Sequence, residues 1–307
     1  MCNPYTSQRE FRFVLTQRCN YTCEFCHGET LQNPQRDLMN TNDWITLFRV
    51  SQEFFGHNKV TFTGGEPLIR KDVITLAKEI YICGGEITIT TNGYFLEEKL
   101  LIGNYIKKLN VSLHSLDQEV YSAITHGEKY SLHKVIYGIQ LFREKYPHVP
   151  VVLNVALVEG VNSELKQIKA LVNLATQIGA DIKFIELYPK GVDGFIPLPV
   201  LSENLNKIGF SKVLSTFRKM SFTNGEVQVA LTQIFCSFAE NEKDPSRFCQ
   251  ENNDLFVTPE GKIKPCRHSM IEFDLKKHLT DDANLDGIKL VLDDAIRHLG
   301  ARCILGK

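Results

Sequence analysis

Three cysteines near the N-terminus carry the most specific chemistry in this sequence. Cys19, Cys23 and Cys26 stand in a CxxxCxxC arrangement, just after an apolar segment, Phe11–Thr16, that is typical of a β-strand. Three thiolates can hold three irons of a 4Fe–4S cluster and leave the fourth iron open to a ligand from outside the protein. The spacing therefore predicts an iron–sulfur cluster with an open coordination position.

Zinc and disulfides are the alternatives for these thiols. A zinc site could combine the three cysteines with His27, because thiolate and imidazole both suit zinc. A disulfide framework is disfavoured because the nine cysteines are an odd number, the chain is long enough for a large core, and no secretory signal is visible. We therefore expect reduced thiols and a cytoplasmic protein.

Composition argues against two classes of partner. The 307 residues carry a formal net charge of −1, and no long basic run with interleaved aromatic residues is present, which disfavours nucleic acid. No apolar run of about 18 residues occurs, so no membrane span is expected. A chain of this length predicts one large α/β domain with an appendage.

The elements that must position the cysteines alternate along the chain. Strand candidates lie near residues 11–16, 58–63, 86–91, 107–113, 150–158 and 181–187, and stretches of helical period lie near 42–55, 72–83, 96–104, 131–146 and 163–178. Six βα units imply a parallel sheet with helical crossovers, here a partial (βα)6 TIM-type barrel rather than a closed eight-stranded one. Ligand loops should then gather at the carboxyl ends of the strands. We assign residues 1–195 to this barrel and 196–307 to a small C-terminal hairpin and auxiliary-cluster region.

A glycine-rich turn follows the second predicted strand. Gly64, Gly65, Glu66 and Pro67 come directly after it, so two glycines and a carboxylate stand at a strand end. Glycine lets backbone approach a ligand closely. A turn that merely closes the strand is the alternative for this motif alone, and its place one βα unit after the cysteines favours a binding role.

Together the cysteine triplet and the GGEP turn resemble those of the radical S-adenosylmethionine (SAM) enzymes. The resemblance implies that the open iron chelates the amino and carboxylate groups of the methionine part of SAM, and that the GGEP turn contacts the amino group. Reductive cleavage of SAM then yields a 5′-deoxyadenosyl radical, which abstracts a hydrogen atom from a substrate. An external electron donor such as flavodoxin or ferredoxin is the implied partner.

Polar residues at later strand ends extend the resemblance. Thr91 and Asn92 end the third strand, Ser112 ends the fourth, and Asn154 lies on the fifth. In radical SAM enzymes such strand ends hold the methionine and ribose parts of SAM, so the resemblance makes these four residues candidate SAM ligands. Glu186 occupies a similar position on the sixth strand. Hydroxyl and amide side chains also cap turns and helices, which is the alternative for each.

The last two strands narrow the resemblance. The segments Asn154–Asn162 and Lys183–Gly191 are similar, in order and spacing, to the GTP 3′,8-cyclases of molybdenum cofactor biosynthesis. With the cysteine triplet, GGEP and the TTNG run, the resemblance covers about residues 10–195.

Cysteines reappear in the C-terminal third. Cys249, Gly261 and Cys266 stand as Cx11GxxxxC after an Asn-Gly hairpin signal, with Cys236 before them and Cys303 near the end. This pattern resembles the auxiliary-cluster module of radical SAM enzymes and implies a second 4Fe–4S cluster, with zinc or plain buried thiols as the alternatives. Four ligating cysteines would close the cluster for electron transfer or structure. Three would leave an iron for substrate, or a thiol as hydrogen-atom donor.

The chain departs from the GTP 3′,8-cyclases at several positions. Asn252 replaces a cluster cysteine, Asp254 and Phe256 stand where arginines are expected, and Val152 stands where a basic residue is expected. A guanidinium binds phosphate oxygens bidentately, and neither Asp nor Phe can do so. The sequence therefore disfavours GTP cyclisation.

We expect a radical SAM enzyme that cyclises, epimerises or oxidises a small biosynthetic molecule such as a nucleotide or sugar. A maturase or epimerase of a ribosomally made peptide is the alternative enzyme, and an iron–sulfur or zinc-binding scaffold or sensor is the non-enzymatic alternative. Further candidates for substrate contact, each with a core or surface role as the alternative, are His114, His126, His268, Arg12, Lys190 and Arg267.

Overall fold

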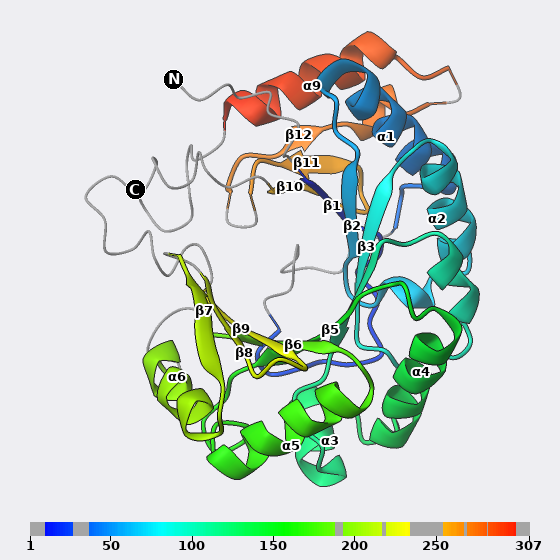
Figure 1. Cartoon of the computed structure of the whole chain (residues 1–307). Coiled ribbons are helices and arrows are strands. Elements are labelled where there is room, and N and C mark those ends of the chain that lie inside the picture. Colours follow the sequence, from blue (N-terminus) through cyan, green and yellow to red (C-terminus); the bar gives the residue numbers. More distant parts are fainter. Residues whose placement is uncertain are drawn as a thin grey trace.

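Six parallel strands curve around a common centre with helices on their outer side (Figure 1). They are β1 (Glu10–Val14), β2 (Lys59–Thr63), β3 (Glu86–Thr91), β4 (Lys108–Ser112), β5 (Val151–Ala156) and β6 (Asp181–Ile185), and they neighbour one another in chain order. This confirms the predicted α/β class and the partial (βα)6 barrel. The computed structural model describes residues 10–26, 37–187, 193–216, 219–233, 254–266, 269–280 and 282–298.

The connections between these strands are mostly helical. The crossover helices are α1 (Thr41–Phe55), α2 (Val73–Ile82), α4 (Leu132–Lys145) and α5 (Leu165–Gln177), with a short extra helix α3 (Gln118–Thr125) between β4 and α4. The helix predicted near 96–104 is wrong, because only a 3-10 turn, η2 (Leu100–Asn104), forms there. Gly103 packs so closely on Tyr146 that a Cβ atom would lie 2.4 Å from its ring.

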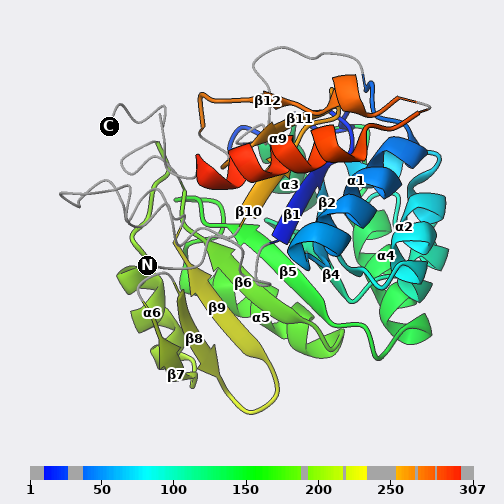
Figure 2. The same cartoon turned by 90° about the horizontal axis from the view of Figure 1, so that it is seen from above.

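The C-terminal third extends the same sheet at both edges. After α6 (Leu198–Lys207) come β7 (Ser211–Ser215), β8 (Lys219–Thr223) and β9 (Gln228–Thr232), and β9 pairs parallel with β6. At the other edge β10 (Asp254–Val257) pairs parallel with β1 (Figure 2). It is followed by β11 (Lys262–Lys264), β12 (Phe273–Asp274), η3 (Lys276–His278) and α9 (Leu285–Arg297). The sheet therefore runs through the predicted boundary at 195, which stays a prediction. Within the described ranges, no helix has both the length and the apolar character that a membrane span needs.

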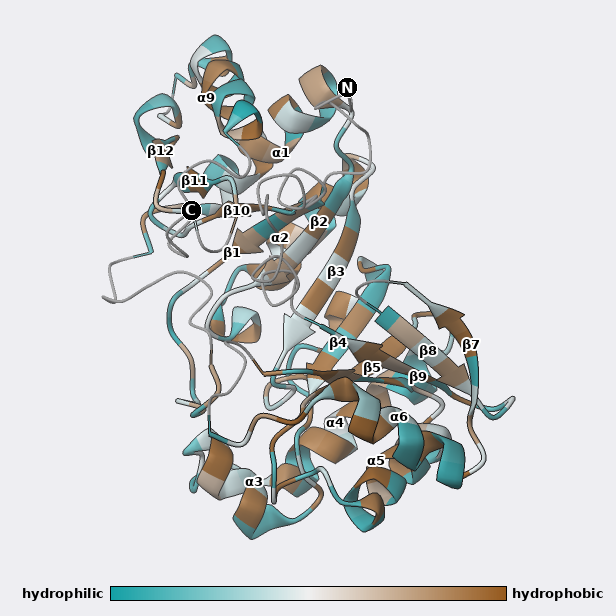
Figure 3. Ribbon diagram, turned by 90° about the vertical axis from the view of Figure 1, so that its left-hand side faces the viewer, coloured by the Kyte–Doolittle hydropathy of each residue, from teal (hydrophilic) through white to brown (hydrophobic). Residues whose placement is uncertain are grey.

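The two faces of the parallel strands differ in character. Phe11, Phe13 and Phe62 are buried with the helices, whereas Arg12 and Thr61, which pair in register, belong to the other face. Bands of opposite hydropathy alternate along β3, β4 and β8 in Figure 3. Parallel sheets covered by helices on both faces have nearly continuous apolar strands. The alternation therefore marks an inner face that helices do not cover.

Candidate active site

The cysteine loop follows β1 and is held at both ends by backbone hydrogen bonds. At its start, the N–H groups of Gly65 and Glu66 donate to the carbonyls of Thr16 and Arg18, each at 2.8 Å. Further along, the N–H groups of Thr22 and Glu24 donate to carbonyls of α3, at 3.1 and 3.2 Å. The last carbonyls of a helix have no partner within the helix, so the end of α3 is a ready acceptor site. The end of this short helix therefore anchors the cysteine loop by backbone hydrogen bonds.

The three thiols of this loop need a cation to become thiolates. Cys19 and Cys26 are exposed and Cys23 is half-buried. The pKa of Cys19 is raised to about 11 and that of Cys23 to about 12, chiefly because the thiols are partly removed from water. The charges of Glu66 and Cys26 contribute at Cys19, and those of Cys26 and Cys19 contribute at Cys23. Because metal ligation requires the thiolate, the metal must supply the charge that stabilises it.

The donor set of three thiols in CxxxCxxC spacing suits a 4Fe–4S cluster by its chemistry. Among the described residues, no three His, Cys, Asp or Glu side chains converge as the ligands of one metal ion would. A 4Fe–4S cluster instead spreads its thiolates over separate irons. The zinc alternative also needs His27, which lies outside the described residues.

The glycines of the GGEP turn are required by the cysteine loop itself. A Cβ atom on Gly64, whose φ is +142°, would lie 2.4 Å from the carbonyl oxygen of Thr16, and one on Gly65 would lie 2.3 Å from that of Arg18. The sequence predicts that the two glycines let the backbone approach a ligand closely. In the structure their close neighbour is the backbone of Thr16 and Arg18. Pro67 then begins the 3-10 turn η1 (Pro67–Ile69).

Glu66 connects this turn to the end of β3. Its fully buried carboxylate accepts hydrogen bonds from the Thr91 hydroxyl and the Asn92 N–H, both at 2.7 Å, and from the Leu68 N–H at 2.8 Å. Burial raises the pKa of Glu66 to about 7, and the three donors oppose the shift. The Thr91 hydroxyl therefore positions Glu66, and a direct contact of Thr91 with SAM stays a prediction.

Asn92 links the end of β3 to the cysteines. Its amide Nδ2 donates to Asn20 Oδ1 at 2.7 Å and lies 3.9 Å from Cys19 Sγ. Its Oδ1 accepts from the Tyr94 N–H at 3.0 Å. The TTNG segment, the GGEP turn and the cysteine loop therefore form one connected site at the carboxyl ends of β1 to β3.

Ser112 and Asn154 lie beside this site on the inner face. They are paired in register at the ends of β4 and β5. Asn154 is 7% exposed, and its buried Oδ1 has no hydrogen-bond partner among the described residues. Asn110 lies two residues before Ser112 on β4, so it is on the same inner face. Its buried Oδ1 also has no hydrogen-bond partner among the described residues, while its Nδ2 donates to Thr90 at 3.4 Å. Sequence reasoning missed Asn110, although its alternation with buried residues places it on this face.

His114 is a neutral donor held near the cysteine loop. Its Nδ1 accepts a hydrogen bond from the Ala156 N–H at 3.1 Å, so the ring proton is assigned to Nε2. Burial lowers the pKa of His114 to about 4, which keeps the ring uncharged. The ring packs against Phe25 of the cysteine loop with 4.4 Å between centroids.

The remaining candidates are more scattered. His126 ends α3 at the surface, 3.6 Å from Glu24, and Glu186 is buried and accepts from Gln233 at 3.3 Å. Cys266 follows β11 and is half-buried. Several predicted residues lie outside the described residues, so the structure does not place them: Cys236, Cys249, Cys303, Asn252, His268, Lys190 and Arg267.

Asp254 and Phe256 both contact Arg12. Their strand β10 lies next to β1, with Phe256 directly opposite Arg12 in register. Arg12 Nη1 lies 3.7 Å from Asp254 Oδ2, and the guanidinium carbon lies 5.5 Å from the centre of the Phe256 ring. The two residues that stand where arginines are expected thus hold the arginine of β1.

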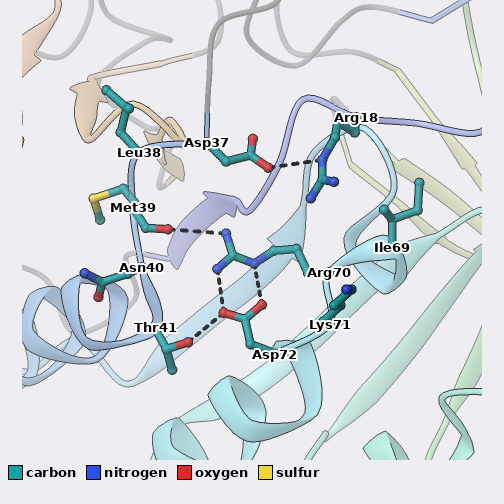
Figure 4. A pocket seen from close by; sticks show the side chains of 10 residues that line it. All are labelled: Arg18, Asp37, Leu38, Met39, Asn40, Thr41, Ile69, Arg70, Lys71 and Asp72. Atoms are coloured by element: carbon teal, nitrogen blue, oxygen red, sulfur yellow. Dashed lines mark hydrogen bonds and ion pairs between the residues drawn. The ribbon is translucent and has the colours of Figure 1, made fainter.

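A polar pocket of about 450 Å³ lies beside the cysteine loop (Figure 4). Its central group is Arg70, which is 7% exposed and donates to the carbonyls of Leu15 and Met39 and to both carboxylate oxygens of Asp72. Burial would raise the pKa of Asp72, but hydrogen bonds from Arg70 and Thr41 hold it below its usual value. Asp72 stands just before α2, makes no side-chain cap and binds Arg70 instead.

Comparison with known proteins identifies similar sequences and folds. The family model of the radical SAM superfamily matches residues 13–172. A GTP 3′,8-cyclase of Peptoclostridium acidaminophilum is 32% identical over 300 residues, covering 92% of this chain and 87% of that protein. A probable GTP 3′,8-cyclase of Pyrobaculum aerophilum is 29% identical over 281 residues, covering 89% and 88%. The crystal structure of Streptococcus suis SuiB bound to S-adenosylmethionine shares the fold, with a TM-score of 0.66 and 18% identity. That match covers 90% of this chain and 64% of SuiB.

Proposed function

Because the chain belongs to the radical SAM superfamily, we propose that Cys19, Cys23 and Cys26 hold a 4Fe–4S cluster and that the enzyme acts on a small biosynthetic molecule at the inner face of the partial barrel. Enzymes of this superfamily use such a cluster with SAM to generate a 5′-deoxyadenosyl radical that abstracts a hydrogen atom. The observation that carries the proposal is the convergence of the cysteine loop, the GGEP turn and Asn92 at one edge of the sheet.

Different residues of the protein would position the cysteine loop and bind SAM. Glu66 fixes the GGEP turn against Asn92, so the turn and the cysteine loop keep one geometry. Ser112 and Asn154 offer a hydroxyl and an unpartnered amide oxygen to the polar parts of SAM. His114 adds a neutral N–H donor beside the cysteine loop. Substrate would then lie deeper along the inner face, below these contacts.

We further propose a second 4Fe–4S cluster held by Cys266 with Cys236, Cys249 and Cys303. The support is the Cx11GxxxxC spacing and the tight turn at Gly261, whose φ of +82° allows β10 and β11 to form a hairpin before Cys266. An external one-electron donor such as flavodoxin or ferredoxin would reduce the enzyme.

GTP 3′,8-cyclisation is the second candidate function. Relatives of that name match nearly the whole chain at about 30% identity. The residues Asp254 and Phe256 count against it, because they stand beside Arg12 where arginines are expected and cannot bind phosphate bidentately. A peptide substrate has less support, because the similarity to SuiB is one of fold alone.

The first test is reductive cleavage of SAM by anaerobically reconstituted protein. We expect 5′-deoxyadenosine from the wild type and none from the Cys19→Ala/Cys23→Ala/Cys26→Ala variant, with near eight irons falling to near four if both clusters exist. Cys83→Ala is the matched control, because this thiol lies near Arg49 and away from the loop. Cleavage that survives in the triple variant would reject the assignment.

The second test distinguishes the two candidate functions. Wild-type enzyme is incubated with GTP, SAM and dithionite, and the products are analysed by mass spectrometry. We expect no cyclised nucleotide and no rise in 5′-deoxyadenosine on adding GTP. A cyclised product would establish the GTP 3′,8-cyclase activity instead.

A further inference from the structure

The turn between β10 and β11 is buried, which is unusual for a hairpin turn. Residues 256–261 are all buried, and the Gly261 N–H donates to the Thr258 carbonyl at 2.9 Å to close the turn. Hairpin turns normally lie on the surface, where water satisfies their polar groups. This turn instead packs against another part of the protein.

The carboxylate of Glu260 belongs to this turn and is 6% exposed. Its hydrogen-bond partner is the side-chain amide of Gln17, which donates to Glu260 Oε1. Among the described residues, no lysine or arginine forms an ion pair with Glu260. Removing a carboxylate from water is costly unless a partner offsets the cost. The contact with Gln17 is therefore the specific interaction that holds Glu260 inside the protein.

A second set of contacts joins the same turn to the same part of the chain. The Pro259 carbonyl accepts hydrogen bonds from the N–H groups of Leu38 and Met39, at 2.8 and 2.9 Å. Asp37, the residue before them, accepts from the Thr16 hydroxyl at 2.7 Å. These three residues line the pocket beside the cysteine loop (Figure 4). The turn thus reaches residues 16–18 both directly and through this segment.

Residues 16–18 lead straight into the cysteine loop, because Cys19 follows them at once. Backbone carbonyls of this stretch accept the N–H groups of Gly65 and Glu66, each at 2.8 Å. The stretch therefore sets both the start of the cysteine loop and the way in which the GGEP turn meets it. A displacement of Gln17 would reach both of these parts of the site.

We infer that Glu260 is a positioning residue for the cysteine loop. Through Gln17 it holds Cys19 and the GGEP turn in the geometry that binds SAM, so the C-terminal hairpin takes part in assembling the site. The inference rests on the proposed function for the identity of SAM as the ligand. The contact itself is tested without SAM, so its failure is distinguishable from failure of the proposed function.

The first experiment measures hydrogen exchange of the peptide that contains Gly65 and Glu66, in reconstituted full-length protein without SAM, by mass spectrometry. Gln17→Leu and Glu260→Leu should each exchange about tenfold faster than the wild type, because each removes one hydrogen bond to a carboxylate that supports these amides. Glu260→Gln should stay within about twofold of the wild type, because its side-chain carbonyl accepts the same hydrogen bond.

Two features of the chain make this experiment decisive. Gln17 is half-buried, so Gln17→Leu removes the contact without changing the buried turn and gives the result where Glu260→Leu does not fold. Glu272→Gln is the matched control, because this carboxylate is partly exposed and pairs with lysines of β11. Its exchange should equal that of the wild type. Unchanged exchange in Gln17→Leu, or no rescue by Glu260→Gln, overturns the role of Glu260.

The second experiment titrates SAM into the dithionite-reduced protein and follows the electron paramagnetic resonance spectrum of the cluster. The SAM concentration for half of the spectral change should rise about tenfold in Gln17→Leu and in Glu260→Leu. The double variant should lie within about twofold of either single variant, because both changes remove one contact. Multiplicative effects, or an unchanged SAM response, overturn the inference. A wild type without any response rejects the proposed function, and the exchange result then decides the role of Glu260.

Discussion

The buried carboxylate of Glu66 makes stability depend on pH in a direction opposite to that of most carboxylates. Burial raises its pKa from 4.5 to about 7. Below pH 4.5 the group is protonated whether the chain is folded or unfolded, so it adds no pH dependence there. Between pH 4.5 and 7 the unfolded chain releases the proton that the folded chain keeps. Stability contributed by Glu66 is therefore present at low pH and lost as pH rises through this window.

The size of this change in stability follows from the rise in the pKa of Glu66. One pKa unit corresponds to about 1.4 kcal/mol, so the full window amounts to about 3 kcal/mol. For a chain of this size such a change corresponds to about 5 °C or more in melting temperature. Glu66→Gln cannot ionise, so its stability should lack this component. The amide still places one donor against the N–H groups of Leu68 and Asn92, which lowers stability at every pH by about 1–3 kcal/mol.

The assay is thermal unfolding of wild type and Glu66→Gln, prepared side by side, between pH 4.5 and 8. The wild type should be clearly more stable than the variant at pH 5, and the difference should shrink by about 5 °C by pH 8. Glu97→Gln, which changes an exposed glutamate, should run parallel to the wild type. A constant difference between wild type and Glu66→Gln would refute the raised pKa, and a difference that grows with pH would mean that the three donors outweigh burial.

Three further changes test other parts of the site. Gly65→Ala should lower the iron content after reconstitution by up to half, the share of the first cluster, because the added Cβ would lie 2.3 Å from the Arg18 carbonyl oxygen. Gly160→Ala adds backbone strain at a φ of +72° but meets no atom within 4 Å, so it should retain its iron. Arg70→Met should destabilise the protein by about 1–3 kcal/mol in denaturant unfolding, because Asp72 and the Leu15 and Met39 carbonyls lose their donor, and Lys71→Met should be nearly neutral. The lowered pKa of His114, about 4 against 6.5, predicts that its contribution to stability falls by about 3 kcal/mol as pH falls through that window, opposing the gain from Glu66. The measurement is therefore the difference between wild type and His114→Gln, and a difference that stays constant from about pH 7 to about pH 4 would contradict the lowered pKa.

Site features whose residues lie close together in sequence could be predicted, because residue type and spacing alone identify them. Cys19, Cys23 and Cys26 form one loop, and the GGEP turn follows its strand at once, so no long-range contact had to be known. The strand order of the barrel also followed, since consecutive βα units pair in chain order.

Features that depend on distant pairing could not be predicted in this way. The strand β10 lies beside β1, although more than two hundred residues separate them, and this pairing brings Asp254 to Arg12. The backbone hydrogen bonds between the cysteine loop and the end of α3 also join segments about a hundred residues apart. The role of Thr91 illustrates the same limit, because its hydroxyl looks like a ligand contact in sequence and is used by Glu66 in the structure.

The separation of the two faces explains how substrate can change while the fold is kept. The outer face of the strands is buried against the helices, and burial of apolar area is the main source of stability. The inner face, with Arg12, Asn110 and Asp254, is polar and partly open, so substitutions there alter charge and hydrogen bonding without making a cavity in the core. A chain about 30% identical to GTP 3′,8-cyclases over most of its length can therefore keep the outer face while residues of the inner face differ. On this reasoning Asp254→Asn should leave the melting temperature within about 2 °C of the wild type, since the pair that it breaks is partly exposed, and a drop of about 5 °C or more in thermal unfolding would contradict it.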